Sequence, residues 1–324
     1  MVLSRPEIVG TFGVVATTHW MATAAAMAIL EKGGNAFDAA VAAGCVLHIV
    51  EPDQNGPGGD CPLILWSQKR QKVDVICGQG SAPAAITSEK LRDQGLDTMP
   101  GIGHLPTVVP GSFGAWMRLL HDYGTLGVRD VLEAAITIAR DGFPMKPGVA
   151  RVIAGGAAFM KEHWPSSAEV YLVAGEAPAA GTLYTLPAQA ATYERIVKEA
   201  EAAGGSRENQ VEAARRAWYE GFVAEAIDRF MREPVMDTSG EAHRGYMTGE
   251  DLAAWRAEVE EPMTIDYGDY TVCKAGPWAQ SPVLLQQLAL LKGFDIAAMD
   301  PNGAEFVHTV QECCKLAMAD REKF

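Results

Sequence analysis

The stretch "TTHWMATAAAMAILEKGGNAFDAAVAAGCVLHIVEP", residues 17–52, decides the fold because it predicts two consecutive buried helices. We expect the first helix to begin near a threonine cap and to end at Gly33-Gly34-Asn35. The second helix is expected to run from about Ala36 to Ile49, before Pro52. Alanine dominates both segments and charges are few, so neighbouring elements can approach on more than one face. Such helices are typical of the interior of a layered fold.

The residues that follow predict a hairpin. "CPLILW" (61–66) and "KVDVIC" (72–77) are short apolar and β-branched runs joined by a polar turn. Helices are expected at about 112–122 and 127–141, each followed by a glycine.

The second half of the chain is predicted to be rich in helix. The segment 151–260 is more charged, with 210–233 its clearest helical stretch, and 270–275 is expected to be a strand. Residues 281–293 have a serine cap, a proline at the first helical position and a final glycine. We therefore predict one α/β domain over 1–324. Its parts are the Ala-rich helices and hairpin at 1–150, an α-rich segment at 151–260, and a return to the main layers at 261–324.

Composition excludes several kinds of partner. The net charge of −14 repels phosphate backbones and anionic lipids, so we expect no nucleic acid and no membrane. The longest apolar run, at 39–50, is too short for a bilayer, which needs about 20 residues. The N-terminus has no signal-peptide pattern, and most cysteines lie in apolar runs. We expect a cytoplasmic protein, or a periplasmic or secreted one if a leader has been removed.

No common cofactor or metal motif occurs. The seven histidines show no metal-ligand spacing, and there is no phosphate-binding loop, dinucleotide fingerprint or GxSxG elbow. We therefore expect no cofactor and no metal. The loops at 52–60, 78–83 and 101–112 are rich in glycine and proline, which fits either tight turns or close backbone approach to a ligand. The residues alone indicate an α/β protein that supplies neither nucleophile nor base.

Those loops and their surroundings resemble the γ-glutamyltransferase (γ-glutamyltranspeptidase) family. The match is strongest at 24–66, with its "KGGNAFDAAVA" turn and helix, its "VEP" and its Gly-Gly loop. Six further matches follow in the family's order: "SAPAA" (81–85), "VPGSFGAWMRLLHDYGTL" (109–126), "AITIARDGFPM" (135–145), "MTGEDLAAW" (247–255), "PVLLQQLALLKGFD" (282–295) and "AEFVHTVQECCKLAMADREKF" (304–324). Together they span almost the whole chain.

The resemblance implies a four-layer αββα sandwich of the N-terminal nucleophile hydrolase type, with an α-rich insertion. In that family a precursor cuts itself in two, and this chain resembles the larger, N-terminal piece. The nucleophile is the first threonine of the smaller subunit, which also supplies the oxyanion hole. We therefore expect no catalytic residue in this chain and no activity from it alone. The expected partners are the smaller subunit, in a heterodimer or a dimer of heterodimers, and a small-molecule amide.

One position departs from the family's pattern. Glutamyl-specific members carry an arginine four residues before the proline of the "AP" motif, where it grips the substrate α-carboxylate. Counting back from Pro83 gives Gln79. A neutral amide loses the charge of that pair, which weakens recognition by about 1.5–3 kcal/mol. Asp60 stands where many such relatives have a small residue, which also argues against γ-glutamyl specificity. This favours members that cut other amides, similar to oxamate amidohydrolases or cephalosporin acylases.

The site residues that the resemblance implies are few. Gln79 is expected to face the acyl pocket, which Asn55, Gly58 and Gly59 line at close backbone range, and Gln280 is expected near its mouth. The leading hypothesis is the large subunit of a γ-glutamyltransferase-like amidohydrolase or acyltransferase. A non-catalytic scaffold or binding protein that kept the fold is the alternative.

The last helix carries an expectation of its own. Within 308–320, Val310, Cys314, Leu316 and Ala317 fall on one side, and this apolar face is expected to pack against the smaller subunit. In the family the chain continues from here toward the cleavage site.

Overall fold

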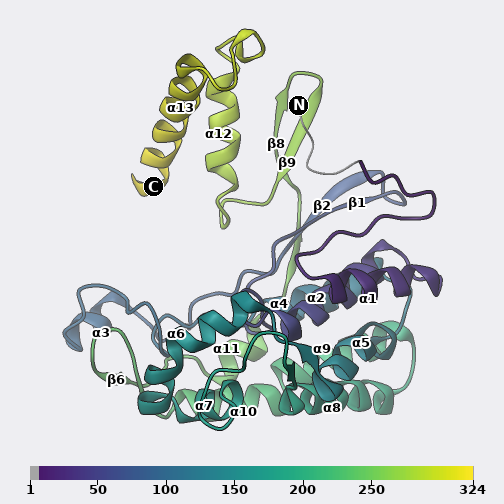
Figure 1. The fold of residues 1–324 in the computed structure, drawn as a ribbon, viewed down its shortest axis with the longest axis vertical. Coiled ribbons are helices and arrows are strands. Elements are labelled where there is room, and N and C mark those ends of the chain that lie inside the picture. Colours follow the sequence, from purple (N-terminus) through teal and green to yellow (C-terminus); the bar gives the residue numbers. More distant parts are fainter. Residues whose placement is uncertain (1–6, 324) are drawn as a thin grey trace. The chain divides into compact units, whose positions relative to one another are not determined.

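A computed structural model describes residues 7–323, which divide into two compact units. Unit 1 contains the residues up to Asp60 together with Gly80–Arg256, and unit 2 contains Cys61–Gln79 with the residues from Ala257 onward. Figure 1 labels elements of both units where there is room. The predicted single domain, with divisions after 150 and 260, stays a prediction.

Helices are the main secondary structure of unit 1. Its short strands form two pairs, β3 (Phe143–Pro144) with β4 (Leu183–Tyr184) and β5 (Val235–Met236) with β6 (Ala242–His243). Its helices are α1 (Trp20–Glu31), α2 (Ala36–Val50), α3 (Ser88–Asp93), α4 (Ser112–Tyr123), α5 (Val128–Asp141), α6 (Pro147–His163), α7 (Pro165–Tyr171), α8 (Pro187–Ala203), α9 (Arg207–Tyr219), α10 (Phe222–Met231) and α11 (Gly249–Ala254). Helix α2 lies at the centre, in contact with α1, α4 and α5.

The two predicted Ala-rich helices are confirmed as α1 and α2. Helix α1 begins one residue after His19, whose Nδ1 accepts a hydrogen bond from the Met21 amide, so the predicted threonine cap is wrong. Thr17 instead donates its hydroxyl hydrogen bond to the His19 carbonyl. Eleven of the fifteen residues of α2 are buried, which agrees with the expected close approach on several faces.

The N-terminus of α2 is held by a buried capping box. The Asn35 side chain accepts hydrogen bonds from the Phe37 and Asp38 amides, and the Asp38 carboxylate accepts one from the Asn35 amide at 2.9 Å. Asp38 is completely buried, and its carboxylate also accepts hydrogen bonds from the backbone amides of Thr125 and Leu126. One side chain therefore both caps α2 and fixes the loop between α4 and α5.

The stretch 210–233, predicted as the clearest helix, is two helices. Helix α9 ends at Tyr219 and α10 begins at Phe222. Gly221 between them has φ −115° and ψ −147°, which is far from helical geometry. Glu220, the cap residue after α9, accepts hydrogen bonds from Arg215 and Arg256, so the break is stabilised by two ion pairs.

Unit 2 combines two antiparallel ribbons with a helical pair. Strands β1 (Leu63–Ser67) and β2 (Lys72–Cys77) form the predicted hairpin, and β7 (Glu258–Glu260) adds to β2. Strands β8 (Met263–Tyr267) and β9 (Tyr270–Lys274) form a second hairpin, which contacts α12 (Ser281–Leu291). A short 3-10 turn, Ile296–Ala298, leads to α13 (Ala304–Lys323).

Helices α12 and α13 pack against each other as a helical hairpin (Figure 1). The buried side chains of α13 are Thr309, Cys313 and Ala317, at the i, i+4, i+8 spacing of one helix face. Ala317, one of the four residues of the apolar face predicted from the sequence, belongs to this buried set, and Leu316 is 58% exposed; the packing of that face against a smaller subunit stays a prediction. The cap of α12 is also corrected: Gln280 precedes the helix without a side-chain hydrogen bond, and Ser281 is its first residue.

No helix within residues 7–323 is long and apolar enough to cross a membrane.

Candidate functional site

The Gly-rich loop after α2 is joined to the start of α4 by its own backbone. The Asn55 amide donates to the Glu51 carbonyl at 2.8 Å, which extends the last turn of α2 into the loop. The Gly59 carbonyl accepts hydrogen bonds from the amides of Gly111 and Ser112, at 3.0 and 2.8 Å. These are orphan donors at the N-terminus of α4, so the loop satisfies groups that would otherwise be unpaired.

A second Gly-rich loop, which contains Gly80 and Ser81, contacts Val109 in the segment that leads to α4. A Cβ atom on Gly80 would stand 1.6 Å from the Val109 carbonyl oxygen, and the Val109 amide donates to the Ser81 carbonyl at 2.9 Å. Only glycine fits such a backbone contact. The glycines of this loop fitted either tight turns or close backbone approach to a ligand, and at Gly80 the structure shows close approach to another part of the chain.

Glu51, the residue that joins α2 to the Gly-rich loop, has a buried carboxylate. Glu51 is 2% exposed and accepts hydrogen bonds from Lys146 Nζ and Thr18 Oγ1. Burial alone would raise the pKa of Glu51, but these hydrogen bonds and the charge of Lys146 outweigh burial and lower it. Burial lowers the pKa of the neighbouring His19. The cluster ties the end of α2 to residues before α1 and before α6.

A buried histidine connects three helices behind the loop. His48 Nδ1 lies 2.9 Å from the Tyr193 hydroxyl, and its Nε2 lies 3.1 Å from Ser112 Oγ. In a neutral imidazole one ring nitrogen donates and the other accepts, and either hydroxyl can serve as the matching partner. Burial lowers the pKa of His48 to about 4 and raises that of Tyr193 well above its usual value.

This arrangement predicts a loss of stability in mild acid. Because the folded pKa is about 4 and the unfolded value is 6.5, the unfolded chain binds a proton first as pH falls between them. The contribution of His48 is therefore complete above pH 6.5, and about 3 kcal/mol of it is lost by pH 4.

Urea unfolding at pH 7 and pH 5 checks this prediction in wild type and His48→Gln. The difference in unfolding free energy between the two proteins should shrink by about 2 kcal/mol at pH 5, because glutamine does not titrate. An unchanged difference would mean that His48 does not titrate as its burial requires.

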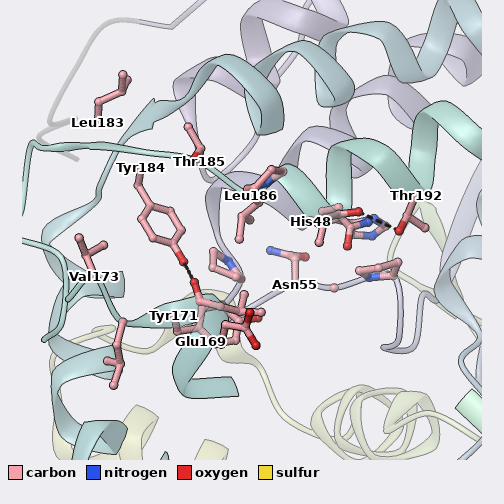
Figure 2. Close-up of a pocket in the computed structure, with 18 residues that line it drawn as sticks. His48, Asn55, Glu169, Tyr171, Val173, Leu183, Tyr184, Thr185, Leu186 and Thr192 are labelled. Atoms are coloured by element: carbon pink, nitrogen blue, oxygen red, sulfur yellow. Dashed lines mark hydrogen bonds between the residues drawn. The ribbon is translucent and has the colours of Figure 1, made fainter. Parts of the chain in front are cut away.

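Next to the loop, unit 1 contains a cavity of about 800 Å³. Its walls come from the end of α2, the loop 52–57, the end of α7 with residues 172–173, β4, and the start of α8. Figure 2 shows Asn55 near its middle, with Glu169 and Tyr184 reaching it from other segments. The Tyr184 hydroxyl is fixed by a hydrogen bond to the Val170 carbonyl.

The five predicted site residues fall in both units. Asn55 lines the cavity in unit 1, on the same loop as Gly58 and Gly59, which are exposed. A Cβ atom on Gly58 would meet nothing within 4 Å, so no described contact requires glycine there. Gln79 lies in unit 2, two residues after the end of β2. Gln280 is the exposed residue before α12, also in unit 2. The roles assigned to these residues in binding stay predictions.

Trp278, which the sequence also places before α12, donates a hydrogen bond from its indole nitrogen to Glu260 at 2.8 Å. This contact fixes the indole ring against a residue of the same unit.

Sequence patterns did not single out the polar residues at the end of α2 as members of a site. His48 stands inside an apolar run, and Glu51 stands between that run and a proline. A titratable side chain in such a run must be buried with a partner, which is the signal that could have singled out both residues. Their partners, Ser112, Tyr193 and Lys146, are distant in the sequence.

Over the described residues, no group of three or more His, Cys, Asp or Glu side chains is arranged to hold a metal ion.

Comparison with known proteins identifies relatives of this chain. The family model described as gamma-glutamyltranspeptidase matches residues 22–324. A glutathione hydrolase-like YwrD proenzyme of Bacillus subtilis (strain 168) is 31% identical over 316 residues, which are 98% of this chain and 55% of that protein. An acylase ACY 1 proenzyme of Pseudomonas sp. (strain V22) is 30% identical over 324 residues, covering 96% of this chain and 53% of that protein.

Comparison with solved structures also identifies similar proteins. A structure named LmbA2991HD is 49% identical with a TM-score of 0.95, and the match covers 99% of this chain and 55% of that one. Gamma-glutamyltranspeptidase of Helicobacter pylori is 23% identical with a TM-score of 0.85, covering 98% of this chain and 85% of that one, and shows the same fold. The predicted α+β fold of the N-terminal nucleophile hydrolase type is therefore confirmed. The chain spans about half the length of the curated relatives that it matches.

Because the family model matches nearly the whole sequence, this chain belongs to the gamma-glutamyltranspeptidase family.

Proposed function

We propose that this chain is the larger subunit of a self-processing amidohydrolase or acyltransferase whose nucleophile is the N-terminal threonine of a smaller subunit. One observation carries the proposal: the family match runs over residues 22–324, whereas relatives named as proenzymes are nearly twice as long. A longer precursor leaves room for a second subunit beyond the part that this chain matches.

In the proposed reaction, the threonine hydroxyl attacks the amide carbonyl while its own α-amine takes up the proton. The amine of the substrate then leaves with that proton, and the acyl group stays on the threonine oxygen. Water or a second amine afterwards attacks this ester and releases the acyl group. The residues of this chain take no part in the bond changes. Their role is to hold the loops at 51–60 and 80–81, and with them Asn55, Gly58 and Gly59, in fixed positions. The binding roles of Gln79 and Gln280 belong to this proposal as well.

The acyl group is proposed to be other than γ-glutamyl. Gln79 stands where glutamyl-specific members have an arginine, and a neutral amide pairs poorly with an α-carboxylate. The acylase relative from Pseudomonas is consistent with such a substrate. A scaffold without activity remains the second candidate, and it predicts no turnover of any amide.

The complete two-subunit protein tests this proposal. We expect it to release p-nitroaniline from short-chain acyl anilides faster than from γ-glutamyl-p-nitroanilide. Turnover of neither class of anilide, by a protein whose folding circular dichroism has confirmed, would favour the scaffold.

Restoring the arginine is predicted to restore glutamyl recognition. Gln79→Arg should raise kcat/KM for γ-glutamyl-p-nitroanilide about tenfold or more, because a charge-assisted pair contributes about 1.5–3 kcal/mol. Gln79→Met, of similar length but uncharged, should give no gain. Equal activities of the arginine and methionine variants would show that Gln79 does not face the α-carboxylate.

A further inference from the structure

The segment 13–17, "GVVAT", leads toward α1 without belonging to any described helix or strand. Its backbone N–H and C=O groups form no hydrogen bond with any of the described residues. Exposure alternates along it, because Val14 and Ala16 are exposed whereas Val15 and Thr17 are half-buried. A period of two is the burial pattern of a β-strand, and valine and threonine favour that conformation. The segment therefore has the pattern of a strand but lacks a strand partner.

An apolar groove of about 350 Å³ lies between this segment and the Ala-rich helices. Residues 14–17 form one wall, and the other walls include Leu30 of α1, Ala40 and Leu47 of α2, and Trp116 of α4. No Asp, Glu, Lys or Arg occurs among the described residues that line it. The groove therefore fits uncharged, apolar side chains.

The chain around this segment exposes several large apolar side chains. Phe12 is 68% exposed and Trp20 is 66% exposed, while Val14 itself is 58% exposed. Single exposed apolar residues are ordinary on a protein surface. A run of them beside an apolar groove and an unpaired extended backbone is instead typical of a surface that a partner covers.

The confirmed fold indicates what this partner is. In an αββα sandwich a helical layer packs on a sheet. The described strands of unit 1 are two pairs of two-residue strands, and no residue of any described strand lines the groove beside α1 and α2. The curated relatives are nearly twice as long as the part that this chain matches, which leaves room for further strands. A second copy of this chain is a poorer occupant, because each copy carries a net charge of −14.

We infer that an extended segment of the smaller subunit adds to residues 13–17 as a β-strand and lays alternate apolar side chains in the groove. This inference rests on the proposed function, because that function supplies the smaller subunit. Backbone hydrogen bonds from the added strand satisfy the unpaired groups of 13–17. The uncharged walls disfavour a strand with acidic or basic side chains on the facing side.

Hydrogen exchange and photo-cross-linking of the complete two-subunit protein test the inference. We expect at least two of the amides at 14–17 to exchange about 100-fold or more slowly than in an unstructured peptide, because they are paired in a sheet. A p-benzoylphenylalanine in place of Val14 should cross-link to the smaller subunit. The same probe in place of Val152, which is 56% exposed on α6, should not. Protection of one amide or none, or a cross-link from position 14 to a second copy of the larger subunit, would overturn the inference.

Two variants then locate the contact in the groove. Ala40→Trp places a large ring on the groove wall and should speed exchange at 14–17 about tenfold or more. Ala154→Trp, at an exposed position of α6, should leave that exchange unchanged. Equal exchange in the two variants, once circular dichroism has confirmed that both are folded, would also overturn the inference. A wild-type precursor that stays uncleaved overturns the proposed function as well, whereas a cleaved protein without protection at 14–17 overturns this inference alone.

Discussion

Replacing Gly80 with alanine is expected to destabilise the protein by about 4 kcal/mol or more, or to prevent folding altogether. The new Cβ atom would stand 1.6 Å from the Val109 carbonyl oxygen and 2.6 Å from the carbonyl carbon. Both are backbone atoms, so no side-chain rotation can relieve the overlap. The backbone itself must move, and the hydrogen bond from the Val109 amide to the Ser81 carbonyl would then be lost.

Gly58→Ala is the matched control for this experiment. A Cβ atom there meets nothing within 4 Å, so the unfolding free energy should change by no more than about 0.5 kcal/mol. If Gly58 lines the acyl pocket as predicted, the same variant should lower amidase activity while its stability is retained. Urea unfolding followed by tryptophan fluorescence measures the first effect. A Gly80→Ala protein as stable as Gly58→Ala would contradict the described contact between Gly80 and Val109.

Replacing Asp38 with alanine is expected to lower the unfolding free energy by about 3–5 kcal/mol. The carboxylate is completely buried and accepts four hydrogen bonds, from the Asn35 amide, both donors of Thr125, and the Leu126 amide. Alanine leaves these donors without an acceptor where water cannot replace it. The variant also loses one half of the capping box of α2, the hydrogen bond from the Asn35 amide, while the Asn35 side chain can still cap the helix.

Asp130 provides the comparison, because it occupies the same third position in α5. Its carboxylate is exposed and accepts one hydrogen bond, from the Gly127 amide at 3.0 Å. Asp130→Ala should therefore cost only about 0.5–1 kcal/mol. Thermal and urea unfolding of the two variants separate the cases. Equal costs for Asp38→Ala and Asp130→Ala would show that burial adds nothing to the cap.

Periodicity and turn residues predicted α1, α2, α4 and α5 and the hairpin of β1 and β2, because each is determined locally. Glycine and proline mark the ends of these elements, and such signals need no knowledge of distant residues. The cap of α1 was wrong because three polar residues, Thr17, Thr18 and His19, precede the helix. Sequence does not decide which of them turns its side chain toward the Met21 amide.

Long-range features could not be predicted in the same way. The pairing of Lys146 with Glu51 joins residues 95 positions apart, and the contact of Gly80 with Val109 follows from the path of two loops. The face of α13 that is buried within this chain depends on where α12 lies, and no local signal gives that position. Of the residues that line the cavity, the sequence brought out Asn55 through the Gly-rich loop, but not Glu169, which stands in an ordinary helical stretch.

The central claim is that this chain is one subunit of a self-cleaving precursor. Intact-mass spectrometry with N-terminal sequencing of the purified product of the complete gene tests it most directly. We predict two fragments that copurify, the larger containing the residues of this chain and the smaller beginning with threonine. A single uncleaved polypeptide, or a smaller fragment that begins with a residue other than threonine, would contradict the account.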